Sequence, residues 1–247
     1  MKVIISPAKR MKVNPDLLPV KGMPQFMEET KLLCSCIQQL SYEEARALWQ
    51  CNDKLAALNY ERFAGMDLEK GLTPAILSYE GLQYQHMAPV VFSEEAVQYV
   101  ETHLRILSGF YGVLAPFDGV VPYRLEMKAR LLVQEKKDLY EFWGDKLYRK
   151  VFHEESTVLN LASKEYSSAI EAYLTPEDRF ITVEFGELSG GKVKQKGTLA
   201  KMARGEMVRY MAENNITDVE GLKAFSGLGY QYSEEWSGQN RLVFLLV

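Results

Sequence analysis

Short apolar runs separated by amphipathic helices constrain the fold of this chain more than any other feature of its sequence. Apolar segments stand at both ends, at Val3–Ile5 and Arg241–Val247, and a third stands at Val158–Leu161. Such runs are typical of strands buried on both faces of a sheet. The strands and helices follow no strict βαβ repeat, and no linker, low-complexity segment or internal repeat divides the chain. We therefore predict a single α+β domain over residues 1–247, with helices around a central mixed β-sheet and the terminal strands near its centre.

Local signals predict the remaining elements. Two predicted helix starts have capping-box spacing, Ser41 with Glu44 and Thr217 with Glu220. Gly190-Gly191 forms the tip of a predicted hairpin. Apolar periodicity and alternation predict helices at 25–39, 42–50, 53–63, 93–107, 138–152 and 198–214, a turn of helix at 175–176, and strands at 75–79 and 180–185.

Composition narrows the classes of function. The chain has 247 residues and a formal net charge of −4, which argues against a dedicated, globally basic nucleic-acid binder. Six basic residues and one acid lie between Lys192 and Arg209, so a local basic surface is expected. No segment has the roughly 20 apolar residues of a membrane span, and the N-terminus has no signal-peptide core. We expect a cytoplasmic protein that does not bind membranes.

The cysteines and histidines indicate neither a disulfide framework nor a zinc site. Cys34, Cys36 and Cys51 are odd in number, the three histidines are scattered, and the sequence contains no C-x-x-C pair. We interpret the thiols as buried and chemically idle, with a redox sensor as the alternative. No metal site and no cofactor are predicted.

The segment 103–127 is the first candidate for function. Its predicted helix breaks at Gly109 and Gly112, which bracket two exposed-looking aromatic residues, Phe110 and Tyr111. The pattern resembles the hairpin of a helix-hairpin-helix element, where main-chain N–H groups in a glycine turn meet a DNA phosphate. The usual hairpin has one residue between its glycines, whereas this one has two. The alternative is a helix C-cap at Gly109 packed beneath aromatic residues.

Polar residues that follow predicted strands form a second candidate site. Ser6 and Lys9 come directly after the first strand, at the place where α/β sheets usually hold ligand groups. Five polar residues would make a hydrolytic or phosphoryl-handling pocket if they converge; these are Arg124, Glu126, Asp145, Asn160 and Ser163. The sequence contains no G-x-S-x-G, H-E-x-x-H or P-loop motif that would name a reaction.

The predicted helix at 198–214 has an apolar face and a basic one. At 100° per residue, Lys201 lies opposite the apolar face, with Arg204 and Arg209 on its flanks. A solvated face explains such a pattern, and a phosphate-facing surface is the alternative. The second interpretation draws on Gly205, which permits close approach at a cost of about 1 kcal/mol in helix propensity relative to alanine. Arginine also suits bidentate phosphate contact.

Seven sequence blocks, in order along nearly the whole chain, resemble the YaaA family of bacterial peroxide-stress proteins. They are ISPAK (5–9), DKLAALNYERF (53–63), HLRILSGFYGVLAPFDGVVPYRLEM (103–127), DLYEFWGDK (138–146), NLASKEYS (160–167), ARGEMVRYMAEN (203–214) and GYQYSEEWSGQNRLVFL (229–245). The resemblance implies a cytosolic protein that limits oxidative damage and is associated with lower free intracellular iron. It also implies a fold peculiar to the family, a positively charged cleft, a helix-hairpin-helix-like element and largely sequence-independent DNA binding.

Carried over to this sequence, the resemblance assigns phosphate binding to two sets of residues. The hairpin contributes Ser108, Gly109 and Gly112. The cations of the cleft are Lys9, Arg105, Arg124, Lys128, Lys201, Arg204 and Arg209. Direct iron binding is a third and weaker option, which would use carboxylate ligands. The oligomeric state stays open, with a monomer favoured.

An enzyme is the alternative function. It would act on a nucleotide, or on a damaged base exposed from the stack, through the neighbourhood of Lys9, Arg124, Glu126 and Asp145. Glu126 and Asp145 are the candidate catalytic carboxylates. The positions of five cations in the folded chain separate a polyanion site from ordinary surface charge. A polyanion site requires that one cleft be lined by Lys9, Arg124, Lys201, Arg204 and Arg209.

Overall fold

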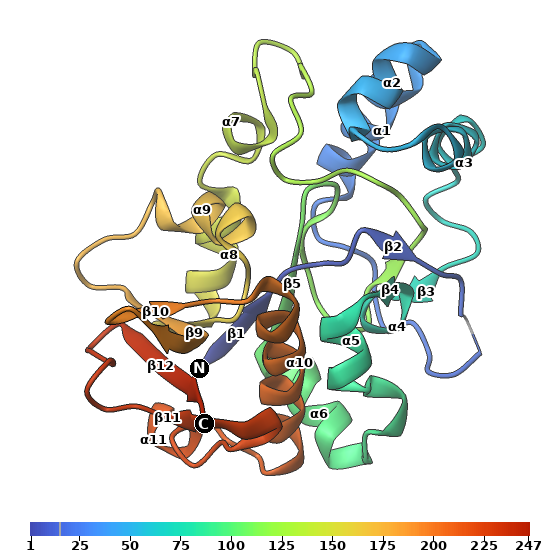
Figure 1. The fold of residues 1–247 in the computed structure, drawn as a ribbon. Helices are drawn as coiled ribbons and strands as arrows, with labels where there is room; N and C mark the ends of the chain where they lie inside the picture. The colour runs from blue at the N-terminus through green and yellow to red at the C-terminus, as the bar shows by residue number, and fades with distance from the viewer. Residues whose placement is uncertain (15) are drawn as a thin grey trace.

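Two of the apolar runs pair in the interior of a central sheet. β1 (Lys2–Ile5) lies between β8 (Thr157–Asn160) and β5 (Leu104–Ser108) and runs parallel to both. Figure 1 shows the fold in a computed structural model, which describes residues 1–14 and 16–247. Every residue of β1 is buried, as expected for a strand with neighbours on both sides and helices on both faces.

The sheet is mixed because antiparallel strands close its edges. β9 (Arg179–Ser189) runs parallel to β8, and β12 (Arg241–Leu246) runs parallel to β9. The antiparallel strands are β11 (Tyr230–Tyr232) beside β12, β6 (Gly112–Leu114) beside β5, and β10 (Lys192–Lys194) in a hairpin with β9. The predicted α+β class with a central mixed sheet is confirmed. β1 lies near the centre as expected, whereas β12 lies next to the edge strand β11.

Helices cover both faces of the sheet (Figure 1). α6 (Glu94–His103) packs on β1 and β5, and α10 (Gly197–Glu213) packs on β9, whereas α8 (Lys146–Glu154) packs on β6 and β8. The helices are α1 (Met27–Gln38), α2 (Tyr42–Trp49), α3 (Asp53–Ala64), α4 (Ala75–Ser78), α5 (Leu82–Met87), α6 (Glu94–His103), α7 (Leu139–Trp143), α8 (Lys146–Glu154), α9 (Lys164–Glu171), α10 (Gly197–Glu213) and α11 (Val219–Leu222), with 3-10 turns η1 (Pro89–Val91) and η2 (Gly227–Gly229). Two short strand pairs lie outside the sheet, β2 (Arg10–Met11) with β4 (Tyr79–Glu80) and β3 (Thr73–Pro74) with β7 (Gly119–Val120).

Two predicted elements have the wrong secondary structure. The predicted helix at 93–107 ends at His103, and Leu104 begins β5. Helical periodicity continued through Leu104 and Leu107 because a strand buried on both faces also places apolar residues there. The predicted strand at 75–79 is mostly the helix α4, a single turn closed by the Tyr79 N–H, which donates to the Ala75 carbonyl.

Three smaller expectations fail at element ends. The predicted helix at 138–152 is divided at Gly144, whose φ of 51° takes the backbone out of the helical region. The N-cap of α11 is Asp218, one residue after the predicted Thr217. The expected turn of helix at 175–176 is a plain turn closed by the carboxylate of Asp178.

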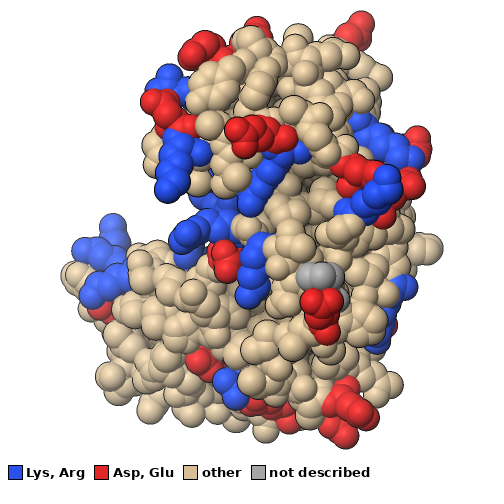
Figure 2. All heavy atoms as spheres, turned by 90° about the vertical axis from the view of Figure 1, so that its right-hand side faces the viewer, with Lys and Arg blue, Asp and Glu red and all other residues tan. Residues whose placement is uncertain are grey.

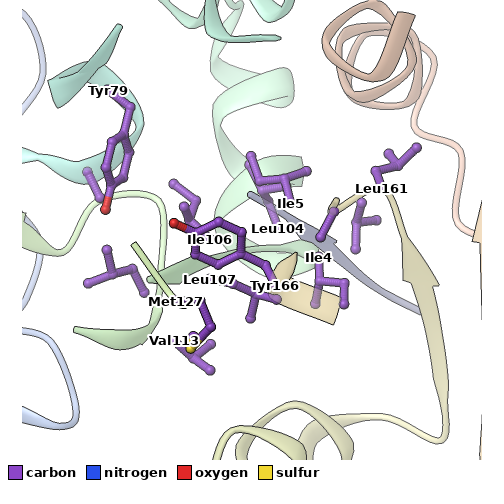
Figure 3. Close-up of a cluster of buried hydrophobic side chains, with 14 of the residues drawn as sticks. Ile4, Ile5, Tyr79, Leu104, Ile106, Leu107, Val113, Met127, Leu161 and Tyr166 are labelled. Atoms are coloured by element: carbon purple, nitrogen blue, oxygen red, sulfur yellow. The ribbon is translucent and has the colours of Figure 1, made fainter. Parts of the chain in front are cut away.

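A buried cluster joins the sheet to the segments around its carboxyl edge. Side chains of β1, β5 and β6 meet Met127 and the ring of Tyr166, which belongs to α9 (Figure 3). Each fully buried aliphatic side chain of this kind stabilises the fold by about 1.5–3 kcal/mol. The cluster therefore fixes the first turn of α9 against the end of β1.

Asp118 predicts a pH dependence of stability. Its carboxylate accepts from the N–H of Ala115, and burial raises the pKa of this group from its ordinary value of about 3.8 to about 6. The folded chain then binds a proton that the unfolded chain has lost between about pH 4 and 6, so stability falls as pH rises through that window. We expect Asp118→Asn to stabilise the protein by about 2 kcal/mol at pH 7 and not at pH 3.5. Urea unfolding at both pH values measures this, and equal effects at both would contradict it.

Candidate functional site

A cleft opens where β1 and β8 end side by side. Its volume is about 520 Å³, and Ser6 and Ser163, which follow these two strands, lie on its wall. In the space-filling view a deep notch enters the molecule from the left, with Lys and Arg side chains gathered along its walls (Figure 2). The other residues that line the cleft come from the segments 7–10, 80–84, 123–126 and 165–166 and from α10. Parallel strands commonly hold ligands at their carboxyl ends.

Cationic side chains from three separate segments meet in this cleft. Lys9 and Arg10 follow β1, Arg124 belongs to the loop after β7, and Lys201 and Arg204 belong to α10. The carboxylates on the same walls are Glu80, Glu126 and Glu165. The cleft therefore carries an excess of positive charge on a protein whose net charge is negative.

Glu126 fixes two of the cations. Its Oε2 lies 2.8 Å from Lys9 Nζ, and its Oε1 accepts from Arg124 Nη2 at 3.1 Å. Lys128 is more distant, with its Nζ 3.9 Å from Oε2. Glu126 and Arg124 are largely buried whereas Lys9 is exposed. Because a buried guanidinium needs a counter-charge, Glu126 holds Arg124 in place at the cleft wall and leaves Lys9 at the rim.

Close packing of α10 against α5 brings the basic helix to the cleft. A Cβ atom on Gly205 would lie 2.1 Å from the Gln83 carbonyl oxygen, so only glycine allows this approach. The close approach expected at Gly205 is thus made by α5 and not by a phosphate. Arg204 is half-buried beside it. Burial lowers the pKa of the Arg204 guanidinium, and the charge of Glu184 acts in the opposite direction.

Unpaired hydrogen-bond donors gather around the cleft. Among the described residues, buried side-chain polar atoms without a partner are Gln83 Nε2, Arg124 Nε, Arg204 Nε and Trp49 Nε1. The first three residues line the cleft, and Trp49 lines a smaller adjoining hollow of about 60 Å³ that also contacts Lys9, Arg124, Glu126 and Lys128. Native proteins pair nearly all such groups, so their concentration around one cleft is unusual.

Hydroxyl groups organise the floor of the cleft. Ser6 Oγ donates to Ser163 Oγ at 3.1 Å and accepts from the Ser163 N–H at 2.8 Å. The Tyr84 hydroxyl donates to the Ser6 carbonyl at 3.0 Å. Burial raises the pKa of Tyr123, another wall residue, to about 12, so that hydroxyl stays protonated at neutral pH.

The glycine segment at 108–112 is part of the core and lies outside the cleft. It joins β5 to β6 in a β-hairpin, so the expected helices on both sides of it are wrong, and Phe110 and Tyr111 are buried rather than exposed. The N–H groups of both residues donate to Ser108 Oγ. A Cβ on Gly109 would lie 2.6 Å from a carbonyl oxygen of the 123–127 loop, and one on Gly112 would meet the Trp143 ring at 2.9 Å. These glycines serve chain packing, and their buried main chain is closed to a phosphate.

Four other candidate residues also lie away from the cleft walls. Arg105 Nη1 donates to the carbonyls of Glu101 and Leu104. Arg209 pairs with Glu213 at 2.7 Å, one helical turn further along α10. Asp145 pairs with Arg149 at 2.6 Å at the start of α8. Asn160, proposed for the pocket, holds the turn after β8 by accepting from the Ala162 N–H.

Several wall residues were not found from the sequence. Gln83 and Tyr84 reach the cleft only because α5 packs on Gly205, and nothing in their local sequence signals this. Arg10 directly follows the predicted Lys9, and its positive charge was a sequence signal that could have identified it as a wall residue. Tyr166 and Glu165 come with the first turn of α9, next to the predicted Ser163.

Within the described ranges, 1–14 and 16–247, no group of three or more His, Cys, Asp or Glu side chains is arranged to hold a metal ion. None of the helices in those ranges is both long and apolar enough to cross a bilayer. Cys34, Cys36 and Cys51 are free thiols, and burial raises the pKa of Cys34 and Cys36.

Fold and site together define an α+β protein with a basic cleft at the carboxyl ends of parallel strands. Comparison with known proteins assigns it more closely: residues 1–236 match the profile described as peroxide stress protein YaaA, and the chain belongs to this family. A UPF0246 protein of Lachnoclostridium phytofermentans is 55% identical over 245 residues, 99% of this chain and 96% of that one. UPF0246 proteins of Desulfitobacterium hafniense and Limosilactobacillus reuteri are 52% and 51% identical, over 99% and 100% of this chain and 98% and 100% of their own lengths.

Proposed function

We propose that the cleft binds DNA through its phosphates, largely independently of sequence, and that this binding limits iron-dependent oxidative damage. The observation that carries the proposal is the convergence of Lys9, Arg10, Arg124, Lys201 and Arg204 on one cleft from three distant segments. Phosphate contacts from Lys and Arg supply most of the affinity of sequence-independent DNA binding. The unpaired N–H donors on the walls add groups that suit phosphate oxygens.

A physical link connects DNA binding with protection from peroxide. DNA carries a condensed layer of cations, and a protein that neutralises its phosphates releases them. Ferrous ions held in that layer generate oxidant next to the bases when peroxide arrives. A family member that occupies the phosphates displaces the iron, so damage at the covered DNA falls without any iron site on the protein.

Binding is better supported than catalysis. Of the residues named for an enzyme, Lys9, Arg124 and Glu126 meet in the cleft, whereas Asp145 pairs with Arg149 outside it. Glu126 is engaged by the other two, an arrangement that orients cations for a bound anion.

The salt dependence of DNA binding tests the proposal. We expect fluorescence anisotropy with a labelled 20-base-pair duplex to give a slope of log K against log[salt] of about −4, because about four or five phosphates would be contacted. A duplex of the same length and unrelated sequence is the control and should bind with equal affinity. Absence of binding at low salt, or an affinity that does not change between 50 and 200 mM salt, would rule the proposal out.

A further inference from the structure

The first turn of α9 begins at the floor of the cleft. Ser163 is its N-cap and lines the cleft together with Glu165 and Tyr166. The Ser163 side chain does not cap the helix, and among the described residues the N–H groups of Lys164 and Glu165 have no hydrogen-bond partner. Unpaired amides and the helix dipole at such an end favour a bound anion.

The two serines add a donor beside these amides. Ser6 donates its hydroxyl hydrogen to Ser163 Oγ. The Ser163 oxygen is therefore satisfied as an acceptor, and its own hydrogen has no acceptor among the described side chains and carbonyls. A hydroxyl in this state is ready to donate to a ligand.

Buried, unpaired side chains on the same walls independently indicate a ligand. Gln83 is 7% exposed and Arg124 is 8% exposed, and each has an N–H without a partner. The nearby carboxylates are already engaged, because Glu165 accepts from the Lys128 N–H and Glu126 pairs with Lys9 and Arg124. An acceptor-rich anion would satisfy the donors without displacing these pairs.

The size of the cleft selects which part of a nucleic acid reaches its floor. A volume of 520 Å³ is in the range of small-molecule pockets. A strand end or a single released nucleotide is of the size that such a cleft holds at its floor.

We propose that the floor formed by Ser6, Ser163 and the first turn of α9 seats the terminal phosphate of a nucleic-acid strand. The inference rests on the proposed DNA binding and adds a substrate class to it, namely strand ends that carry a phosphate monoester. A monoester bears about −1.5 to −2 charges at neutral pH and presents three acceptor oxygens. An internal diester has one charge and only two free oxygens, so the donors at this floor favour the terminal phosphate of a strand.

The test compares three single strands of one 12-nucleotide sequence, with a 5′-phosphate, with a 3′-phosphate and with neither, by fluorescence anisotropy. We expect one phosphorylated strand to bind roughly tenfold more tightly than the unphosphorylated strand. Equal affinities for all three strands would overturn the proposed terminal-phosphate site and leave the proposed DNA binding intact. Failure of every strand and of duplex DNA to bind would overturn both.

The variant Ser163→Asp tests the proposed terminal-phosphate site in a protein that stays folded. An aspartate at the N-cap puts a tethered carboxylate on the unpaired amides, so the variant should be at least as thermally stable as the unmodified protein and should lose the tenfold preference. Ser93→Asp is the matched control, because Ser93 caps α6 and lies outside the cleft; it should keep the preference. A folded Ser163→Asp protein that still discriminates the phosphorylated end would contradict the inference.

Discussion

Gly205→Ala is expected to destabilise the protein by about 3 kcal/mol or more, which is at the upper end of overpacking effects. The added methyl group would lie 2.1 Å from the Gln83 carbonyl oxygen and 2.9 Å from the Met87 nitrogen. Both atoms belong to the backbone of α5, so no side-chain rotation relieves the clash and the two helices must separate. Urea unfolding followed by circular dichroism measures the loss, with an unchanged slope if the unfolded state is unaffected.

Gly197→Ala is the matched control for this prediction. Gly197 is the first residue of the same helix, and a Cβ added there meets no atom within 4 Å. The free energy of unfolding of the Gly197→Ala variant should differ from that of the unmodified protein by no more than about 0.5 kcal/mol. If Gly205→Ala were as stable as Gly197→Ala, α5 and α10 would not be in the contact that carries Gln83 and Arg204 to the cleft.

Arg204→Ala is expected to weaken DNA binding about tenfold, and equally for unrelated sequences, because a phosphate contact holds no sequence information. Arg204 lines the cleft, and no described acid forms an ion pair with it, so its loss leaves no partner charge stranded. The fold should therefore persist, which a thermal unfolding curve checks. A tenfold loss for one sequence and none for another would indicate a base contact instead.

Arg209→Ala is the control from the same helix. Arg209 lies five residues further along α10, outside the cleft, and is paired with Glu213. Removing it changes the net charge by the same amount and should leave affinity unchanged. Sequence periodicity predicts both arginines on the flanks of one basic face. In the folded chain Arg209 pairs with Glu213, whereas Arg204 lines the cleft.

The elements that sequence predicted correctly are those with local causes. β1 and β8 were predicted correctly because short, mainly apolar runs suit strands buried on both faces. α2 was found because Ser41 and Glu44 cap it reciprocally. Ser6, Lys9 and Ser163 were placed at a ligand site because carboxyl ends of parallel strands meet at one edge.

The errors arose where distant parts of the chain decide the structure. Leu104 is in a strand because its backbone pairs with β1, a partner about 100 residues away. Gly109 and Gly112 have the composition of a phosphate-binding turn, yet what approaches them is protein, a loop carbonyl and the Trp143 ring. Gln83 carries no local signal at all, since its place on the cleft wall depends on Gly205 in another helix.

The most direct test of the central claim is the slope of log K against log[salt] for Arg204→Ala and Arg209→Ala, measured beside the unmodified protein on one duplex. If the cleft binds DNA phosphates, the slope of Arg204→Ala should be smaller in magnitude by about 1, and that of Arg209→Ala should match the unmodified protein. Equal slopes for all three proteins would place the DNA elsewhere on the molecule and contradict the account.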